Sequence, residues 1–234
     1  MGPRKREAQS FSTLASRLTS MVSGDWTRVS TVLVAGHVYR RLTVKGRKVV
    51  LRAMNWNDLD KLLTFINGLV DEKQRDRRSE LFTGFEHKLT RDEEVNWLAS
   101  RIVQSENGDS VNIVAEVDGR IVANGQITRS HYRESRHHGE LGLTVMGSYR
   151  GIGIGREIVK TLLGEARRIG LKSVDVEFLF INKAAIRTYQ KAGFIEAGRI
   201  PGKVYRNGKF LDSMIMVRRI PRKPSKSRNT SGPG

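Results

Sequence analysis

The sequence predicts a mixed α/β fold, in which a twisted mixed β-sheet carries helices on both faces. One observation is a hairpin: alternating apolar runs at 111–117 and 121–128 flank Asp118-Gly119, a favoured two-residue turn. Another is that amphipathic helical patterns and short strands alternate on either side of this hairpin. A chain of 234 residues can bury one substantial core and still carry terminal extensions.

The segment before the hairpin predicts one strand and two helices. Residues 48–54 alternate enough to form the first strand, and Asn57-Asp58 should cap the helix that follows. Thr90 and Glu93 form a capping box ahead of a second apolar stripe. Both helices should therefore pack one face against the sheet.

The segment after the hairpin continues the alternation to the end of the sheet. We expect strands at 140–145, 174–178, 195–200 and 214–217, and helices at 156–169 and 182–193. The predicted order is β-α-α-β-β-β-α-β-α-β-β, which suits a layered sheet rather than a bundle or a sandwich.

The most informative segment is Arg150-Gly151-Ile152-Gly153-Ile154-Gly155-Arg156, between a strand and a helix. Alternate glycines let the backbone approach a ligand closely, and their N–H groups can converge at the positive end of the helix. This pattern predicts a site for phosphate or pyrophosphate. The spacing is neither the G-x-G-x-x-G of dinucleotide-binding proteins nor a P-loop, because no Gly-Lys-Ser/Thr follows.

A second marked segment runs from Asn182 to Phe194. Asn182 suits the N-cap of a short helix, and Gly193 suits the position just after its end. Ala185, Ile186 and Tyr189 share one face of that helix.

Together the two segments resemble the GCN5-related N-acetyltransferase (GNAT) family. The first matches R-x-x-G-x-G and the second matches N-x-x-A-x-x-x-Y-x-K-x-G-F, in the family's order. Residues 212–216 resemble the family's closing strand, and the resemblance covers residues 49–217. It implies a GNAT-like sheet, acetyl-CoA as co-substrate and no metal ion. The acceptor implied is a primary amine, either the α-amine or a lysine of a protein or peptide.

The resemblance also implies the donor site. The pyrophosphate is expected on Arg150, Gly151, Ile152, Gly153, Ile154, Gly155 and Arg156. The pantetheine is expected along Leu143, Thr144 and Val145, where a backbone N–H would polarise the thioester carbonyl. Asn182 is expected to contact the pantetheine as well as to cap its helix.

Tyr189 is the candidate general acid, because a phenol is protonated at neutral pH and can donate to a departing thiolate. The alternative is a core aromatic residue. The general base is either Glu140, at the start of a strand, or Glu177, five residues before Asn182; water is the third possibility. His131, His137 and His138 lie among arginines, which favours a solvated loop or an acceptor contact over a metal site.

The net charge of +18 is concentrated at the ends of the chain. Residues 1–48 hold ten Lys/Arg against two acidic residues, and 218–234 hold six against none. We therefore expect a basic extension at 1–48 with a docked helix or a targeting peptide, a catalytic domain at 49–217, and a basic disordered tail at 218–234. The tail is either a solubilising segment or a weak contact for nucleic acid or ribosomes.

Two other functions stay open on the sequence. One is a GNAT-shaped module that senses acyl-CoA without turnover, and the other is a nucleic-acid-associated protein that acts through its tails. The chain has no cysteine, so disulfides and thiolate metal sites are excluded. No apolar run is long enough to span a membrane, and we expect a cytoplasmic protein, either monomeric or homodimeric.

Overall fold

A computed structural model describes residues 34–76 and 78–221. Its strands are β1 (Val38–Val44), β2 (Arg47–Ala53), β3 (Ser110–Val117), β4 (Arg120–Arg129), β5 (His138–Val145), β6 (Ser173–Leu179), β7 (Ile195–Arg206) and β8 (Lys209–Arg219). Its helices are α2 (Leu59–Arg75), α3 (Arg91–Glu106), α4 (Ile154–Arg168) and α5 (Lys183–Lys191), with short 3-10 turns η1 (Trp56–Asp58), η2 (Arg133–Ser135) and η3 (Gly147–Tyr149). The mixed α/β fold is thus confirmed.

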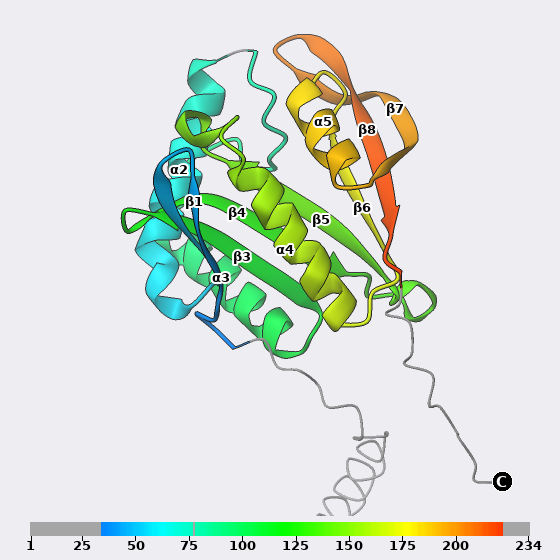
Figure 1. Cartoon of the computed structure of the whole chain (residues 1–234). Helices are drawn as coiled ribbons and strands as arrows, with labels where there is room; N and C mark the ends of the chain where they lie inside the picture. Colours follow the sequence, from blue (N-terminus) through cyan, green and yellow to red (C-terminus); the bar gives the residue numbers. More distant parts are fainter. Residues whose placement is uncertain (1–33, 77, 222–234) are drawn as a thin grey trace, which may run out of the picture. The chain divides into compact units, whose positions relative to one another are not determined.

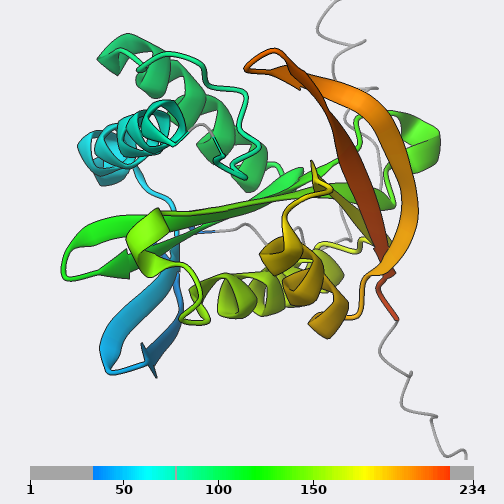
Figure 2. The ribbon, with the colours of Figure 1, turned by 90° about the horizontal axis from the view of Figure 1, so that it is seen from above.

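The strands form one sheet in the order β1-β2-β3-β4-β5-β6-β8-β7 (Figure 1). Helices α2 and α3 cover one face, and α4 and α5 cover the other (Figure 2). Every neighbouring pair is antiparallel except β5 and β6, which are parallel. That parallel pair extends only from His138↔Ser173 to Leu141↔Val176.

Each face of the sheet has its own core. On one face α4 buries Ile158 and Leu162 against β3, β4 and β5. On the other, α2 and α3 bury Phe65 and Leu98 over Val114. Burial of these aliphatic and aromatic side chains is the main stabilising contribution to the fold.

Local turn and cap signals account for several elements. Thr90 accepts a hydrogen bond from the Glu93 N–H, and the Glu93 carboxylate accepts one from the Thr90 N–H, so the expected capping box is confirmed. The turn at Asp118 and Gly119 has φ angles of 49° and 75°, as a two-residue hairpin turn requires.

The start of the first helical segment agrees with the expectation in position but not in hydrogen bonding. Asp58 is the N-cap of α2, as expected, but its side chain makes no capping hydrogen bond there. Asn55 caps the preceding turn η1, accepting a hydrogen bond from the Asn57 N–H at 2.9 Å. Asp58 is instead buried and accepts two hydrogen bonds from Arg52, each of 2.6 Å. A buried carboxylate needs such a partner, and this pairing fixes the position of the turn.

The ordered sheet extends beyond residues 49–217 at both ends. β1 was not predicted, and the expected boundary between residues 48 and 49 falls inside β2. At the other end β8 continues to Arg219 and Ile220 is buried, so residues 218–220 belong to the folded domain and not to a tail. The helix expected near the N-terminus and the basic residues after 221 lie outside the described residues.

The hairpin of β1 and β2 also contacts the glycine-rich segment. Arg40 forms an ion pair with Glu157 in the first turn of α4. The Arg47 guanidinium lies 5.0 Å from the centre of the Tyr149 ring. One residue from each strand of this hairpin therefore contacts a residue that flanks the expected phosphate site.

The last two strands are much longer than the expected 195–200 and 214–217. They form one hairpin, turning at Asn207 and Gly208 with φ angles of 50° and 77°. Most of β7 is exposed, so its sequence lacks the alternation by which a half-buried strand is recognised. Within 34–76 and 78–221, no helix is long and apolar enough to span a membrane.

Glu94 on α3 generates a prediction about stability. Its side chain is buried, and neither carboxylate oxygen has a hydrogen-bond partner among the described residues. Burial raises the pKa of Glu94 from 4.5 to about 7. The folded state therefore binds a proton more tightly than the unfolded state, and stability falls as pH rises from about 4.5 through 7.

We expect Glu94→Gln to stabilise the protein at pH 8 by up to about 3 kcal/mol and to change little at pH 5, because the wild-type side chain is neutral at the lower pH. Denaturant unfolding at both pH values measures this difference. Glu106→Gln, an exposed change on the same helix, is the control. Equal effects of Glu94→Gln at pH 5 and pH 8 would contradict the prediction.

Candidate active site

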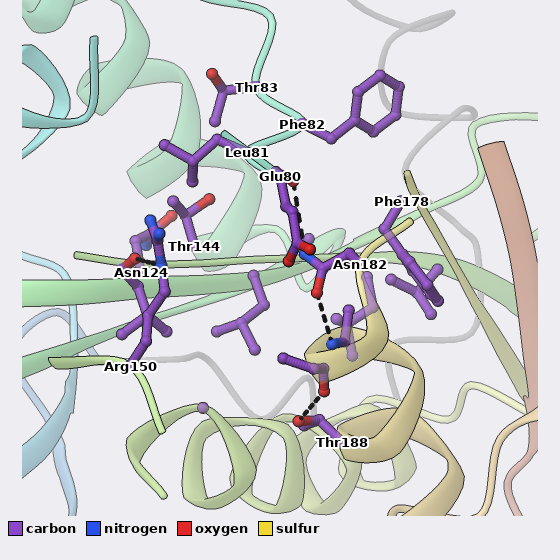
Figure 3. A pocket seen from close by; sticks show the side chains of 18 of the residues that line it. Glu80, Leu81, Phe82, Thr83, Asn124, Thr144, Arg150, Phe178, Asn182 and Thr188 are labelled. Carbon is purple, nitrogen blue, oxygen red and sulfur yellow. Dashed lines mark hydrogen bonds between the residues drawn. The ribbon is translucent and has the colours of Figure 1, made fainter. Parts of the chain in front are cut away.

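The site is a cavity of about 880 Å³ that opens where β5 and β6 separate (Figure 3). Beyond Leu141 and Val176 the two strands no longer pair, while β5 continues along β4 and β6 continues along β8. At the paired end, the His138 ring bonds to Ser173 Oγ at 2.8 Å and Asp175 Oδ1 at 2.9 Å. The strands are therefore tied together at one end and open at the other.

The glycine-rich segment forms one end of the cavity. Gly151 and Gly153 have φ angles of 72° and 105°, which L side chains rarely adopt, and Gly153 is the N-cap of α4. The first N–H groups of α4 have no acceptor within the helix and lie at its positive end. A Cβ on Gly155 would lie 3.3 Å from Leu143, so this glycine lets α4 approach β5 closely.

The expected pyrophosphate residues occupy this end with one difference. Gly151, Ile152, Gly153, Gly155 and Arg156 all line the cavity, as does Arg150. The Ile154 side chain is buried in the core instead, so only its backbone N–H group can face a ligand.

Arg150 has a partner that the sequence did not reveal. Its Nη1 lies 2.5 Å from Glu72 Oε1 on α2, and its Nε donates to the Val145 carbonyl at 2.9 Å. The side chain is 41% exposed, so the rest of its guanidinium can still meet an anion. No periodic pattern could have indicated a contact between α2 and this loop.

Leu143, Thr144 and Val145 line the cavity from β5, as expected. They lie beyond the last β5–β6 pair, so their edge facing β6 has no strand partner. Backbone N–H and C=O groups on such an edge need acceptors and donors from a ligand or from water. This arrangement fits an extended chain with amide groups, and pantetheine is such a chain.

Asn182 and Tyr189 line the cavity from α5. Asn182 caps the helix by accepting from the Ala185 N–H at 2.8 Å, and its side-chain amide points toward the Glu80 carbonyl at 3.5 Å (Figure 3). Tyr189 is only 4% exposed and packs against Phe178 and Phe194. Burial raises the pKa of the Tyr189 hydroxyl well above its usual range, so it is protonated at neutral pH.

Both candidate bases also line the cavity. Glu140 is exposed on β5, beside the paired end of the strands. Glu177 lies one residue past the last pair on β6; its Oε2 accepts from Lys203 Nζ at 2.6 Å, and its Oε1 is buried without a partner among the described residues. The structure thus brings both carboxylates to one cavity with Tyr189.

The remaining wall comes from residues that sequence reasoning missed. Residues 80–85 line the cavity, together with Gln126, whose Oε1 is buried without a partner among the described residues. Residues 80–85 have no helical or strand period, so only the structure could place them. Among residues 34–76 and 78–221, no group of three or more His, Asp or Glu side chains could hold a metal ion.

Comparison with known proteins identifies the class. The acetyltransferase (GNAT) family matches residues 71–194, more than half of the chain. The chain therefore belongs to the GNAT family, as its two motifs indicated. It is an acetyl-CoA-dependent N-acetyltransferase with acetyl-CoA as its co-substrate.

Individual relatives are more distant. YwnH of Bacillus subtilis (strain 168), named provisionally as a phosphinothricin acetyltransferase, is 22% identical over 179 residues, covering 74% of this chain and 99% of YwnH. A ribosomal-protein-alanine N-acetyltransferase from Brucella melitensis superposes with a TM-score of 0.62 at 25% identity, over 72% of this chain and 98% of its own. The yncA protein of Salmonella typhimurium, provisionally an acetyltransferase and solved with its cofactor acetyl-CoA, has a TM-score of 0.63 at 19% identity, over 76% and 96% of the two chains.

The geometry of the glycine-rich segment predicts the effect of one substitution. We expect Gly153→Val to abolish coenzyme A binding in isothermal titration calorimetry, because valine cannot readily adopt the φ of 105° that directs the loop N–H groups. Gly170→Val is the matched control, since Gly170 has a φ of 84° at the other end of α4, with no atom within 4 Å of an added Cβ. Unchanged binding by folded Gly153→Val would remove the loop from the donor site.

Proposed function

We propose that the protein transfers an acetyl group from acetyl-CoA to a primary amine of a protein or peptide, either an α-amine or a lysine side chain. One observation carries this proposal: the glycine-rich loop, Tyr189 and both glutamates line a single cavity. This grouping supports the roles that we assign to them: the loop as the anion site, Tyr189 as the proton donor and a glutamate as the proton acceptor.

The donor end would be held mainly by backbone. The loop N–H groups and Arg156 suit the pyrophosphate, and the open edge of β5 at residues 143–145 suits the pantetheine. Acetyl-CoA supplies the thioester, whose carbonyl carbon the amine attacks. A preorganised N–H group on β5 would stabilise the charge that develops on the carbonyl oxygen.

Tyr189 is the proposed general acid. Its buried hydroxyl stays protonated at neutral pH. It can therefore donate a proton to the departing thiolate. The aromatic packing against Phe178 and Phe194 holds the ring, so the hydroxyl has a fixed direction.

The acceptor amine is cationic at neutral pH and must lose a proton before it attacks. Carboxylates attract that cation and can accept the proton directly or through water. Glu177 lies at the point of strand separation, whereas Glu140 lies closer to the paired end but is freely exposed. Both stay candidates, with water as the third.

A protein or peptide acceptor is supported by the 25% identical relative named as a ribosomal-protein-alanine N-acetyltransferase. YwnH, by its provisional name, indicates instead a small amino-acid-like amine. Thiol release from acetyl-CoA should therefore be measured with N-terminal peptides, lysine peptides and phosphinothricin, and the acetylated products of a cell extract identified by mass spectrometry. Turnover with phosphinothricin alone would contradict the peptide acceptor, and no thiol release with any amine would favour a non-catalytic module.

We expect Tyr189→Phe to bind acetyl-CoA normally and to lower the turnover number about 100-fold, because only the transferable proton is removed. Steady-state thiol release measures the rate, and calorimetry measures donor affinity. Tyr39→Phe removes another buried hydroxyl, one outside this cavity, and serves as the control. An unchanged rate in Tyr189→Phe would leave Tyr189 as a core residue.

We expect the true base to control the acidic limb of the pH–rate profile. A carboxylate base must be ionised to accept a proton, so activity falls as pH drops through its pKa. Of Glu140→Gln and Glu177→Gln, only the variant that lacks the base should lose this limb and retain a low, pH-independent rate. Persistence of the limb in both variants would assign the step to water.

A further inference from the structure

The last turn of α2 contacts both ends of the cavity through consecutive residues. Glu72 reaches the loop between β5 and α4, whereas Lys73 and Gln74 reach residues 83–86. The loop between β5 and α4 lies at the proposed donor end of the cavity. Residues 83–86 lie at another wall. One helical turn therefore connects two parts of the site that are distant in sequence.

Both oxygens of Glu72 are used at the donor end. Oε1 pairs with Arg150 Nη1 at 2.5 Å, and Oε2 accepts from the Gly147 N–H at 3.0 Å. A Cβ on Gly147 would lie 3.1 Å from Oε2, so this glycine permits the close contact. The carboxylate thus bridges the first and last residues of 147–150 and fixes that segment to α2.

Lys73 performs the same task for the opposite wall. Its Nζ donates to the Thr83 carbonyl at 3.3 Å and the Phe85 carbonyl at 3.1 Å. Gln74 donates to the Glu86 carbonyl at 3.3 Å. Thr83 and Phe85 line the cavity, and Figure 3 shows Thr83 and Arg150 on different sides of it. Burial, and then the charge of Arg206, lowers the pKa of Lys73, as expected for an ammonium group enclosed by the loop.

Side-chain donors also hold the preceding residues of this wall. Arg206 on β7 donates to the carbonyls of Ser79 and Leu81, each at 2.8 Å. Residues 79–86 have no strand or helix assigned to them. The path of this segment therefore depends on where α2 and the β7–β8 hairpin place these donors.

We propose that the last turn of α2 couples donor binding to segment 79–86, in which residues 80–85 form a wall of the cavity, with Glu72 and Lys73 as positioning residues. An anion bound at the loop would accept hydrogen bonds from the Arg150 N–H groups that Glu72 does not use. It would thereby fix segment 147–150, which Glu72 joins to α2. The adjacent Lys73 then fixes the carbonyls of the opposite wall. Binding of the acceptor at this wall rests on the proposed function. The coupling itself can be tested with the donor alone. Donor binding would thus favour acceptor binding, and acceptor binding would favour donor binding by the same factor.

Hydrogen–deuterium exchange of the full chain tests this coupling. The probes are coenzyme A and adenosine 3′,5′-bisphosphate, which has phosphates but no pantetheine arm with which to touch residues 79–86. In the wild type we expect both ligands to slow exchange at 146–153 and also at 79–86. Protection of 79–86 by coenzyme A only would overturn the proposal, because direct contact would then explain it.

Two variants separate the steps. We expect Glu72→Gln to abolish protection of 79–86 even at saturating coenzyme A, because the ion pair that joins Arg150 to α2 is lost. Lys73→Met should keep donor affinity within about twofold and lose only the protection of 79–86. Asp71→Asn removes a carboxylate from the same turn, where it pairs with Lys88, and should change neither quantity.

Two results would contradict the proposal: wild-type protection of 79–86 in Glu72→Gln or Lys73→Met, or loss of that protection in Asp71→Asn. Failure of the wild type to bind coenzyme A would instead remove the donor site. Absence of turnover with every amine would remove the proposed function and leave the coupling intact. Failure of the coupling, of the donor site and of the proposed function would therefore each give a different result.

Discussion

The site depends on the end of pairing between β5 and β6. Their register stops at Leu141 and Val176, yet neither strand becomes unsupported, because β4 and β8 continue to pair with them. Antiparallel neighbours thus hold two strands apart across a cavity inside an otherwise continuous sheet. The His138 bridge to Ser173 and Asp175 closes the other end and limits how far the strands can separate. A polar backbone edge is therefore kept open for a ligand instead of being satisfied internally.

The groups to which we assign functional roles are arranged around this gap by rigid elements. α4 begins at one side of it, α5 at another, and the two glutamates lie on the strands themselves. Mounting reactive groups on helices and strands restricts their movement more than loop positions would. The exception is 79–86, whose irregular backbone is held by side chains from α2 and β7. Under the proposed function, such a segment is where variation in acceptor preference would be accommodated most easily.

Local signals explain which parts of the structure could be predicted. The Thr90 capping box, the Asp118-Gly119 turn and the glycine-rich loop each express their conformation within a few residues. The contact between Glu72 and Gly147 could not be predicted, because 75 residues separate them and no sequence pattern links the two segments. β1 was missed because its charged residues obscure the alternation, and the extent of β7 because most of it is exposed. The Asn207-Gly208 turn was a usable signal for that hairpin.

The β1–β2 hairpin has a consequence for how shortened forms of the protein should be made. A chain that starts at residue 49 would lack β1 and would leave the long edge of β2 without its partner. Unpaired strand edges promote association between molecules, so such a fragment would tend to aggregate in solution. It would also lack Arg40 and Arg47, which contact Glu157 and Tyr149 beside the donor loop. Aggregation of such a fragment would result from the missing edge strand and not from an intrinsically unstable catalytic domain.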